Sequence, residues 1–261
     1  MTTRQRNRRM SFVLSSGVML LVLVVGRGVL AQDWRNASQE PVGLAPDAAA
    51  TPEAVVQVYG ARTWGWRGSF GVHTWVAVKP ANAAAYTVYE VIGWRLRWAD
   101  SVLAIHARAP DARWFGNEPE LYADKRGEEA EKLIPRIDAA ARSYPYAREY
   151  TAWPGPNSNT FVAWITRAVP ELGVDLPPTA IGKDYLGAEI FSSAPSGRGL
   201  QFSIGGMLGL TLSGVEGLEL NLLGLTFGIN PFDPALKLPL LGRLGPARAS
   251  LPVSAGSLPR P

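Results

Sequence analysis

The sequence contains no cysteine and only two histidines in 261 residues. The lack of cysteine excludes disulfide bonds, thiolate nucleophiles and cysteine-ligated zinc or iron–sulfur sites. The two histidines, His73 and His106, are too far apart for the paired-histidine helix of zinc hydrolases, and their neighbours match no metal-ligand spacing. We therefore expect neither a metal site nor a cofactor.

A basic surface for nucleic acid is lacking as well, although the net charge is +4. Five of the 26 basic residues are arginines within residues 1–31, a stretch without Asp or Glu. The remaining 21 basic residues are balanced by 22 acidic ones, so the rest of the chain is near neutral. Binding to a nucleic acid backbone requires a concentration of Lys and Arg, and we expect no nucleic acid partner.

The arginine-rich N-terminus precedes an apolar run, residues 12–25, interrupted only by two serines and a glycine. A basic stretch before a short apolar run is typical of a secretory signal, and the residues up to Ala31 are compatible with cleavage there. The alternative is an uncleaved membrane anchor with Arg27 at the far interface. Either way, the sequence predicts a cell-envelope protein that is periplasmic, or anchored in the inner membrane with its domain outside the cytoplasm.

The composition predicts five segments along the chain. The N-terminal signal peptide or membrane anchor is followed by a linker rich in Ala and Pro, an α+β core domain, a C-terminal β region and a disordered tail rich in Pro, Ala, Ser and Arg. Their ranges, in the same order, are 1–31, 32–54, 55–198, 199–245 and 246–261.

The core domain is predicted to be an antiparallel sheet with packed helices. Four runs rich in β-branched and aromatic residues predict its strands: 55–59, 72–79, 86–94 and 102–108. The second and third of these runs are expected to form a hairpin. Apolar residues at helical spacing predict helices over 128–144 and 159–169, and Pro135 is expected to kink the first helix or delay its start.

Between residues 206 and 229, apolar residues alternate with small and polar ones, as in Leu208, Leu210 and Leu212. A period of two predicts strands with one apolar face, in a C-terminal β-hairpin region that turns at residues 214–217. We expect this leucine-rich face to pack on the core domain. Docking on a membrane surface is the alternative.

One arrangement has the logic of an active site. Ser158 lies at the start of a predicted helix, where the helix dipole and backbone N–H groups stabilise an oxyanion. A serine hydroxyl needs a base, and His73 on a predicted strand is the candidate. Glu90, on the next strand, would orient the imidazole if the register places both residues on one face. Asn117 and Asn157 are the fallback orienting groups.

A structural interpretation competes with the catalytic one. Asn157, Ser158 and Asn159 are also well suited to capping a helix. His73 lies among apolar residues and would then be a half-buried histidine bonded to the backbone, and His106 is taken as structural or surface. Some of the tryptophans near Arg62 and Arg67 are candidates for the floor of a groove that binds sugar or lipid. The candidate binding residues are Trp64, Trp66, Trp114, Asn117, Asn157 and Asn159.

Several long stretches carry a resemblance to a known family. They include ARTWGWRGSFGVHTWVAVKP, WPGPNSNTFVAWITRAVPELG, DLPPTAIGKDY and GVEGLELNLLGL. Over roughly residues 55–245 the chain resembles the bacterial domain-of-unknown-function family 3750. That resemblance implies no particular activity.

A second resemblance implies a mechanism. A strand histidine followed much later by Asn-Ser-Asn-Thr-Phe at a helix start is similar to the circularly permuted papain-like hydrolases of NlpC type. In those families a cysteine opens the helix. The resemblance implies that His73 is the base and that Ser158 occupies the nucleophile position, with serine in place of cysteine.

The sequence thus supports several functions. The first is a non-catalytic envelope domain with a groove that binds peptide, glycan or lipid. The alternative is a serine-dependent amide or ester hydrolase or acyltransferase of permuted papain-like type, using Ser158 and His73. A structural or assembly role at the membrane is the third. Whether the protein is an enzyme stays open at the level of sequence.

Overall fold

The computed structural model describes residues 35–246, and in this range the protein is α+β, with two antiparallel sheets and two α-helices. The predicted signal or anchor at residues 1–31 and nearly all of the predicted tail lie outside the described residues. Among the helices of residues 35–246, none has the length and apolar character needed to span a bilayer.

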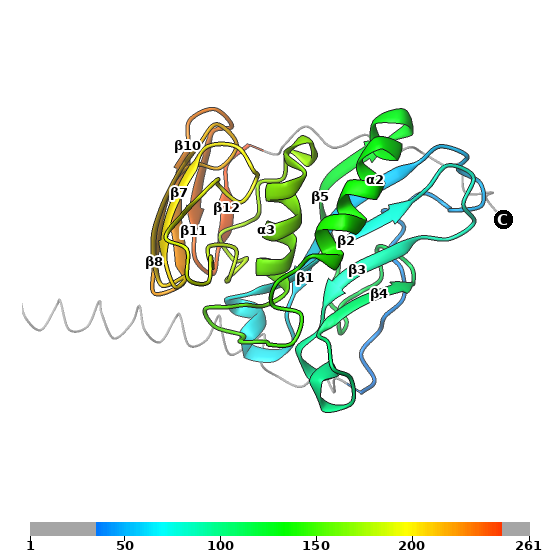
Figure 1. Cartoon of the computed structure of the whole chain (residues 1–261), viewed down its shortest axis with the longest axis horizontal. Helices are drawn as coiled ribbons and strands as arrows, with labels where there is room; N and C mark the ends of the chain where they lie inside the picture. The colour runs from blue at the N-terminus through cyan, green and yellow to red at the C-terminus, as the bar shows by residue number, and fades with distance from the viewer. Residues whose placement is uncertain (1–34, 247–261) are drawn as a thin grey trace, which may run out of the picture.

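The first sheet has five strands in the order β4-β3-β2-β1-β5 (Figure 1). They are β1 (Val55–Arg62), β2 (Val72–Lys79), β3 (Thr87–Val91), β4 (Leu103–Ala107) and β5 (Pro119–Arg126). The four predicted strands and the β2–β3 hairpin are confirmed, but β3 ends at Val91 because residues 93–97 form the 3-10 helix η2 (Gly93–Arg97). Sequence reasoning missed β5, whose polar and charged residues hide its alternation.

Two α-helices pack on one face of this sheet: α2 (Gly127–Arg142) and α3 (Ser158–Ala168). Both lie within two residues of their predicted bounds, and Pro135 sits inside α2 without delaying its start. The core between sheet and helices is apolar and fully buried, with Val76, Ile137 and Phe161 among its members. Two more 3-10 helices, η1 (Gly65–Ser69) and η3 (Pro170–Leu172), follow β1 and α3.

The opposite face of the first sheet carries a second apolar cluster that contains Tyr59, Trp75 and Val88. Leu44 and neighbouring residues pack against it, and the backbone N–H of Leu44 donates to the Asp111 carboxylate at 2.6 Å. Part of the stretch predicted to be a linker is therefore packed on the domain.

The second sheet is a seven-stranded antiparallel meander in the order β12-β11-β10-β9-β8-β7-β6. Its strands are β6 (Phe191–Ser192), β7 (Leu200–Ile204), β8 (Leu208–Ser213), β9 (Gly217–Leu222), β10 (Leu225–Asn230), β11 (Ala235–Leu238) and β12 (Gly242–Leu244). Figure 1 shows α3 between the two sheets. Hydrogen bonds join α3 to the chain just after β6, from Thr166 Oγ1 to the Pro195 carbonyl at 2.5 Å and from Arg167 Nε to the Ser193 carbonyl at 3.1 Å.

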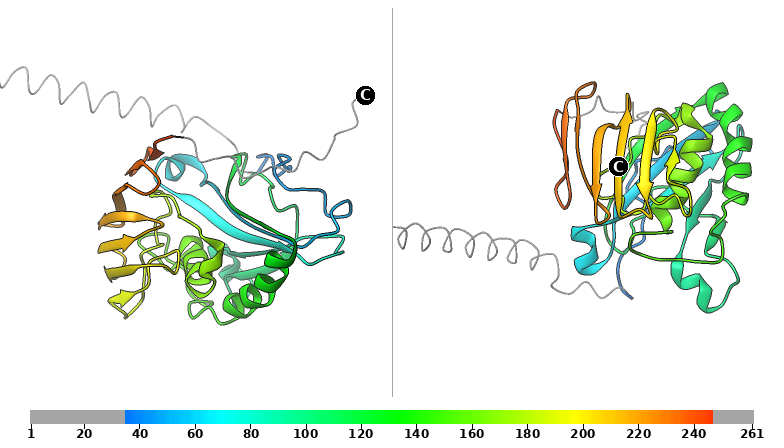
Figure 2. Two further views of the ribbon diagram at one scale, coloured as in Figure 1. Left: turned by 90° about the horizontal axis from the view of Figure 1, so that it is seen from above. Right: turned by 60° about the vertical axis from the view of Figure 1, so that its left-hand side comes forward.

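The second sheet is inverted relative to an ordinary half-buried sheet. In β8 and β9 the buried positions hold Gly209, Thr211, Glu219 and Asn221, whereas the leucines between them are exposed. The polar face looks toward α3 and the first sheet, and in the part of the chain that the structure describes no element covers the other face (Figure 2). The predicted period of two is confirmed, but the expectation that the leucines pack on the domain is wrong.

This inversion predicts opposite responses to similar truncations. Ile165→Ala on α3 should lower the free energy of unfolding by about 2–5 kcal/mol, because the side chain is fully buried and its loss leaves a cavity. Leu210→Ala on β8 should change it by less than about 0.5 kcal/mol, because that leucine is 42% exposed. Urea unfolding of both variants measures the difference. A loss at Leu210 equal to that at Ile165 would contradict the orientation of the second sheet.

Candidate functional site

The start of α3 is built as a helix cap. Asn157 is the N-cap residue, and its side-chain oxygen accepts hydrogen bonds from the backbone N–H groups of Asn159 at 2.9 Å and Thr160 at 3.2 Å. The Thr160 hydroxyl in turn accepts from the backbone N–H of Asn157 at 3.1 Å, which completes a capping box. The polar cluster thus satisfies the orphan donors of the helix, as the structural interpretation predicts.

Asn159 fastens α3 to the first sheet. Its amide nitrogen donates to the carbonyls of Val72 at 3.0 Å and Ile181 at 2.8 Å, and its amide oxygen accepts from the Thr74 hydroxyl at 2.9 Å. The same hydroxyl also lies 3.3 Å from the Ser158 carbonyl. Because Asn159 is buried and its amide is fully used in these bonds, we do not assign it a ligand-binding role.

The structure does not bring His73 and Ser158 together. The residue of β2 whose side chain meets the start of α3 is Thr74, and successive side chains of a strand point to opposite faces. The His73 ring stacks on Trp114 instead, with centroids 3.7 Å apart, on the face of the sheet away from α3. Within residues 35–246 neither histidine is hydrogen-bonded to Ser158, so the predicted nucleophile–base pair is not formed.

His73 and Glu90 do lie on one face, as the catalytic hypothesis required of them. The Nε2 atom of His73 is 2.9 Å from Glu90 Oε2, and Nε2 of His106 is 2.7 Å from Oε1. The Arg108 Nε atom donates to Oε1 at 3.1 Å, while its guanidinium lies over the Trp75 ring at 4.9 Å. A buried carboxylate thus collects two imidazoles and a guanidinium, and His106, taken as structural or surface from the sequence, belongs to the cluster.

Burial and pairing set the protonation of this cluster. Burial lowers the pKa of His73, and the hydrogen bond and charge of Glu90 only partly oppose it. For Glu90 burial acts to raise the pKa, but hydrogen bonds from His106 and His73 and the charge of Arg108 outweigh it, so the pKa lies below its usual range. A neutral His73 donates its Nε2–H to the ionised Glu90. Because this buried carboxylate accepts from three side chains, the arrangement stabilises this face of the first sheet.

The remaining candidate binding residues do not share a groove. Trp114 is packed between the rings of His73 and Trp94, and Asn117 pairs with Trp114 across a tight turn. Trp64 and Trp66 lie exposed at η1.

A cleft of about 320 Å³ lies elsewhere, between the two sheets. Arg62 and Tyr122 line it on one side and Lys237 and Arg243 on the other, and none of the residues singled out by sequence lines it. In the described part of the chain, no group of three or more His, Cys, Asp or Glu is arranged to hold a metal ion.

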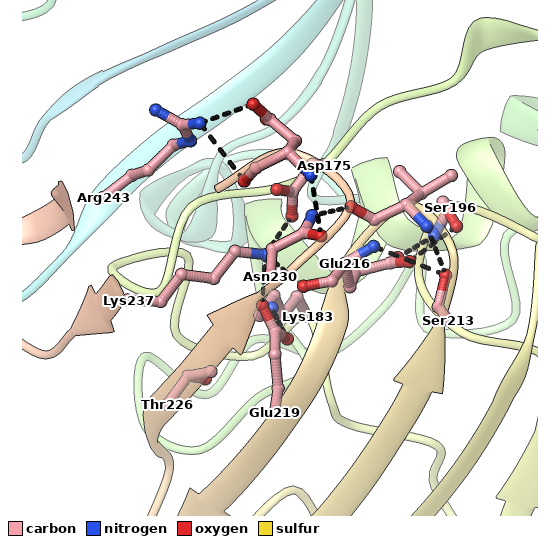
Figure 3. Close-up of polar contacts among 12 residues, drawn as sticks. Asp175, Lys183, Ser196, Ser213, Glu216, Glu219, Thr226, Asn230, Lys237 and Arg243 are labelled. Atoms are coloured by element: carbon pink, nitrogen blue, oxygen red, sulfur yellow. Dashed lines mark hydrogen bonds and ion pairs between the residues drawn. The ribbon is translucent and has the colours of Figure 1, made fainter. Parts of the chain in front are cut away.

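The inner face of the second sheet carries a buried ionic cluster (Figure 3). Glu219 of β9 lies between two lysines: one oxygen accepts from Lys183 in a short hydrogen bond, and the other accepts from Lys237 at 2.7 Å. Lys237 also binds the Asp175 carboxylate at 2.6 Å. Burial disfavours the charge on Lys183, but Glu219, Asp184 and Asp175 outweigh it and raise its pKa. Lys183 therefore stays charged, and the cluster pairs two lysines with two carboxyl side chains.

A second buried carboxylate, Asp184, organises the neighbouring strands. It accepts hydrogen bonds from Gln201 of β7 at 2.6 Å, Asn221 of β9 at 2.8 Å and Thr226 of β10 at 3.3 Å. Because Asp184 belongs to the loop that follows α3, these bonds hold three strands of the second sheet against the core domain. These polar side chains of the inner face thus find their partners within the chain itself.

The outer face of the second sheet forms three continuous apolar rows, which we call the leucine face. Cross-strand partners define the rows. The first row is Ile204, Leu208, Leu222 and Leu225. The second is Phe202, Leu210, Leu220 and Phe227. The third is Leu200, Leu212, Leu218, Ile229, Leu236 and Leu244. No charged side chain interrupts these rows, and eleven of their members are at least 40% exposed, among them Leu200 at 73%.

Sequence reasoning missed both faces of this sheet. The polar residues that alternate with the leucines were visible, including Glu219 and Asn221, but a hydrophobic pattern alone assigns the leucines to the interior. The signal that would have reversed the assignment is the chemistry of the alternate positions. They can satisfy one another and the loop residues Asp175, Lys183 and Asp184, which provide the counter-charges.

Comparison with known proteins gives one match. Residues 53–185, half of the chain, match the profile of a family described as "Protein of unknown function (DUF3750)". The match includes the first sheet and both helices and ends before the second sheet. No curated protein and no solved structure matches the chain.

The burial of His73 predicts a pH dependence of stability. Because its pKa is lowered in the folded state, the unfolded chain takes up a proton below its pKa of about 6.5 while the folded protein does not, so stability falls on acidification. One such group contributes up to about 1.4 kcal/mol per pH unit. Glu90 acts only below its unfolded pKa of about 4.5. Urea unfolding between pH 7.5 and 5.5 should show a smaller slope for His73→Gln than for the natural protein. Parallel curves would contradict this assignment.

We expect a large loss of stability when the carboxylate of the ionic cluster is replaced by an amide of the same shape. Glu219→Gln removes the shared anion of two buried lysines and should lower the free energy of unfolding by about 3–5 kcal/mol. Glu128→Gln is the matched control, since Glu128 pairs with Lys132 on the surface with its side chain 84% exposed, and it should leave the urea midpoint nearly unchanged. Urea midpoints compare the two. Equal midpoints would show that the inner face does not depend on this cluster.

Proposed function

This chain belongs to the family described as protein of unknown function (DUF3750), and we propose that it is a non-catalytic cell-envelope protein whose domain docks on a lipid bilayer through the leucine face. One observation carries the proposal. A sheet of seven strands directs its charged and amide side chains inward and a continuous apolar surface outward.

The chemistry of the face favours lipid over the other ligands that the sequence left open. A glycan needs hydrogen-bonding groups, and an extended peptide needs a free sheet edge or pockets. The centre of the three rows, on β8, β9 and β10, offers neither, because its side chains are aliphatic or aromatic and these strands are paired on both sides within the sheet. A broad apolar surface of this kind gains free energy by leaving water, at about 25 cal/mol for each Å² that is buried.

The N-terminal sequence supports a bilayer as the occupant. The apolar run at residues 12–25 is expected to bring the chain to a membrane, whether it is cleaved or retained. A retained anchor would hold the domain within reach of the lipid surface, where even a weak apolar contact is strengthened by the high local concentration.

The alternative function is a serine-dependent amide or ester hydrolase or acyltransferase using Ser158 and His73. The geometry does not favour it. Thr74, which cannot act as a general base, occupies the strand position that faces Ser158, and the imidazole of His73 is engaged by Glu90 and Trp114 on the other face.

The absence of cysteine provides a clean test by single-site labelling. Leu220→Cys places an environment-sensitive fluorophore such as NBD in the middle row, and Lys132→Cys places it on the exposed surface of α2. The full chain is reconstituted into phosphatidylcholine vesicles. We expect a blue-shifted emission that is shielded from aqueous iodide at position 220, and a water-like emission at position 132. Because both variants share the N-terminal segment, the difference reports on the domain.

Two outcomes would contradict docking on lipid. Water-like emission at both positions would show that the leucine face stays in water. A shift at position 220 that vanishes when the chain is diluted to one copy per vesicle would assign the face to a second copy of the chain.

A further inference from the structure

The exposed aromatic residues outside the second sheet are confined to three short segments. Every exposed large hydrophobic side chain among residues 35–189 belongs to residues 64–66, 94–98 or 150–153, and five of them are tryptophans with 38–66% exposure. The first two segments lie at η1 and η2, and the third precedes α3. We call these three segments, together with the rest of η1, the tryptophan rim.

The rim is connected to one end of the leucine face. Figure 1 shows η1, in cyan, at the lower end of the molecule, and η2 below β3 and β4. The Arg62 guanidinium joins η1 to the second sheet, because it donates to the carbonyls of Gly68 and Ser69 in η1 and to that of Leu240 in the β11–β12 turn. The Tyr150 ring lies against Gly93 of η2, where an added β-carbon would approach it to 2.5 Å. The Trp153 ring lies against Gly224, in the β9–β10 turn, at 3.1 Å by the same measure. The rim therefore continues the apolar surface around the edge of the second sheet.

The rim carries charge of one sign. Arg67 follows Trp66 in η1, and Arg95 and Arg97 alternate with Trp94, Leu96 and Trp98 in η2. The three segments contain no Asp or Glu, although Glu149 and Asp100 border them. Within residues 35–246 none of these three arginines makes an ion pair, and the Arg67 guanidinium lies 5.1 Å from the Trp66 ring centroid. The Arg95 Nε atom donates to the Ser101 carbonyl at 3.3 Å, so among the described residues the positive charge of all three arginines has no anionic side chain as a partner.

We propose that the tryptophan rim binds the phosphate groups of phospholipids at the border of the bilayer region that the leucine face occupies, with a preference for anionic lipids. This inference rests on the proposed docking function. Tryptophan places its ring at the headgroup level of a bilayer, where the apolar ring and the indole N–H are both satisfied. Arginine forms bidentate hydrogen bonds with phosphate. The rim thus sets the orientation of the domain on the membrane.

The test compares two triple variants with the same change of charge. One replaces Arg67, Arg95 and Arg97 by Gln, and the control replaces Lys132, Arg136 and Arg142, which are all on α2. Each also carries the Leu220→Cys probe in the full chain. The docked fraction is measured in vesicles of phosphatidylcholine with increasing phosphatidylglycerol. We expect the ratio of docked to undocked protein to rise with phosphatidylglycerol in the control. In the rim variant this rise should be smaller, by a factor of about five for each of the three arginines removed.

A second measurement reports directly on the distance between the rim and the lipid headgroups. A Ser69→Cys probe in η1 should be quenched by lipids that carry a nitroxide on the headgroup, and the rim variant should lose this quenching while the α2 control retains it. Equal lipid dependence and equal quenching in the two triple variants would overturn the rim proposal and leave docking by the leucine face intact. A Leu220 probe that stays in water with every vesicle would instead overturn the proposed function itself.

Discussion

The architecture depends on the shared carboxylate of Glu219, which pairs Lys183 and Lys237 beneath the second sheet. Burying charges is costly unless each is matched, and here each lysine has an anion within hydrogen-bonding distance. Once these residues occupy the inner positions of β9 and β11, the two-residue period of a strand leaves only the outer positions for the leucines. The exposed apolar face is thus the geometric consequence of a polar interior, and the docking hypothesis follows from it.

Local structure was predictable where one signal dominates. β2 was placed at its observed bounds, and α2 and α3 within two residues, because apolar residues at a single period mark a face packed on one core. The second sheet shows the limit of that argument. Its period was correct, but periodicity separates two faces without saying which is buried. The buried face is determined by Asp175, Lys183 and Asp184, which bind its polar side chains. These three residues belong to a loop before the sheet, so the periodicity of the strands carries no information about them.

His73 and Ser158 lie apart for a related reason. The catalytic hypothesis requires β2 to meet the start of α3, and there the Thr74 hydroxyl lies 3.3 Å from the Ser158 carbonyl. One residue of register separates Thr74 from His73, and it places the imidazole on the opposite face. Glu90 was found beside His73 because both belong to that face. A site assembled from two elements is therefore fixed by register, which residue types alone do not specify.

In a protein that is surrounded only by water, the exposure of the leucine face is energetically unfavourable. Fully burying one leucine is worth about 1.5–3 kcal/mol relative to leaving it exposed, and three rows of such side chains forgo that gain. The sheet does not need it for folding, since its own backbone pairing, Asp184 and the Glu219 cluster hold it to the core domain. Burial of the rows against another surface would therefore still release this free energy. The tryptophan rim extends the leucine face with indoles and arginines. A partner that matches the leucine face and the rim together has an apolar interior bordered by phosphate groups, as a phospholipid bilayer has.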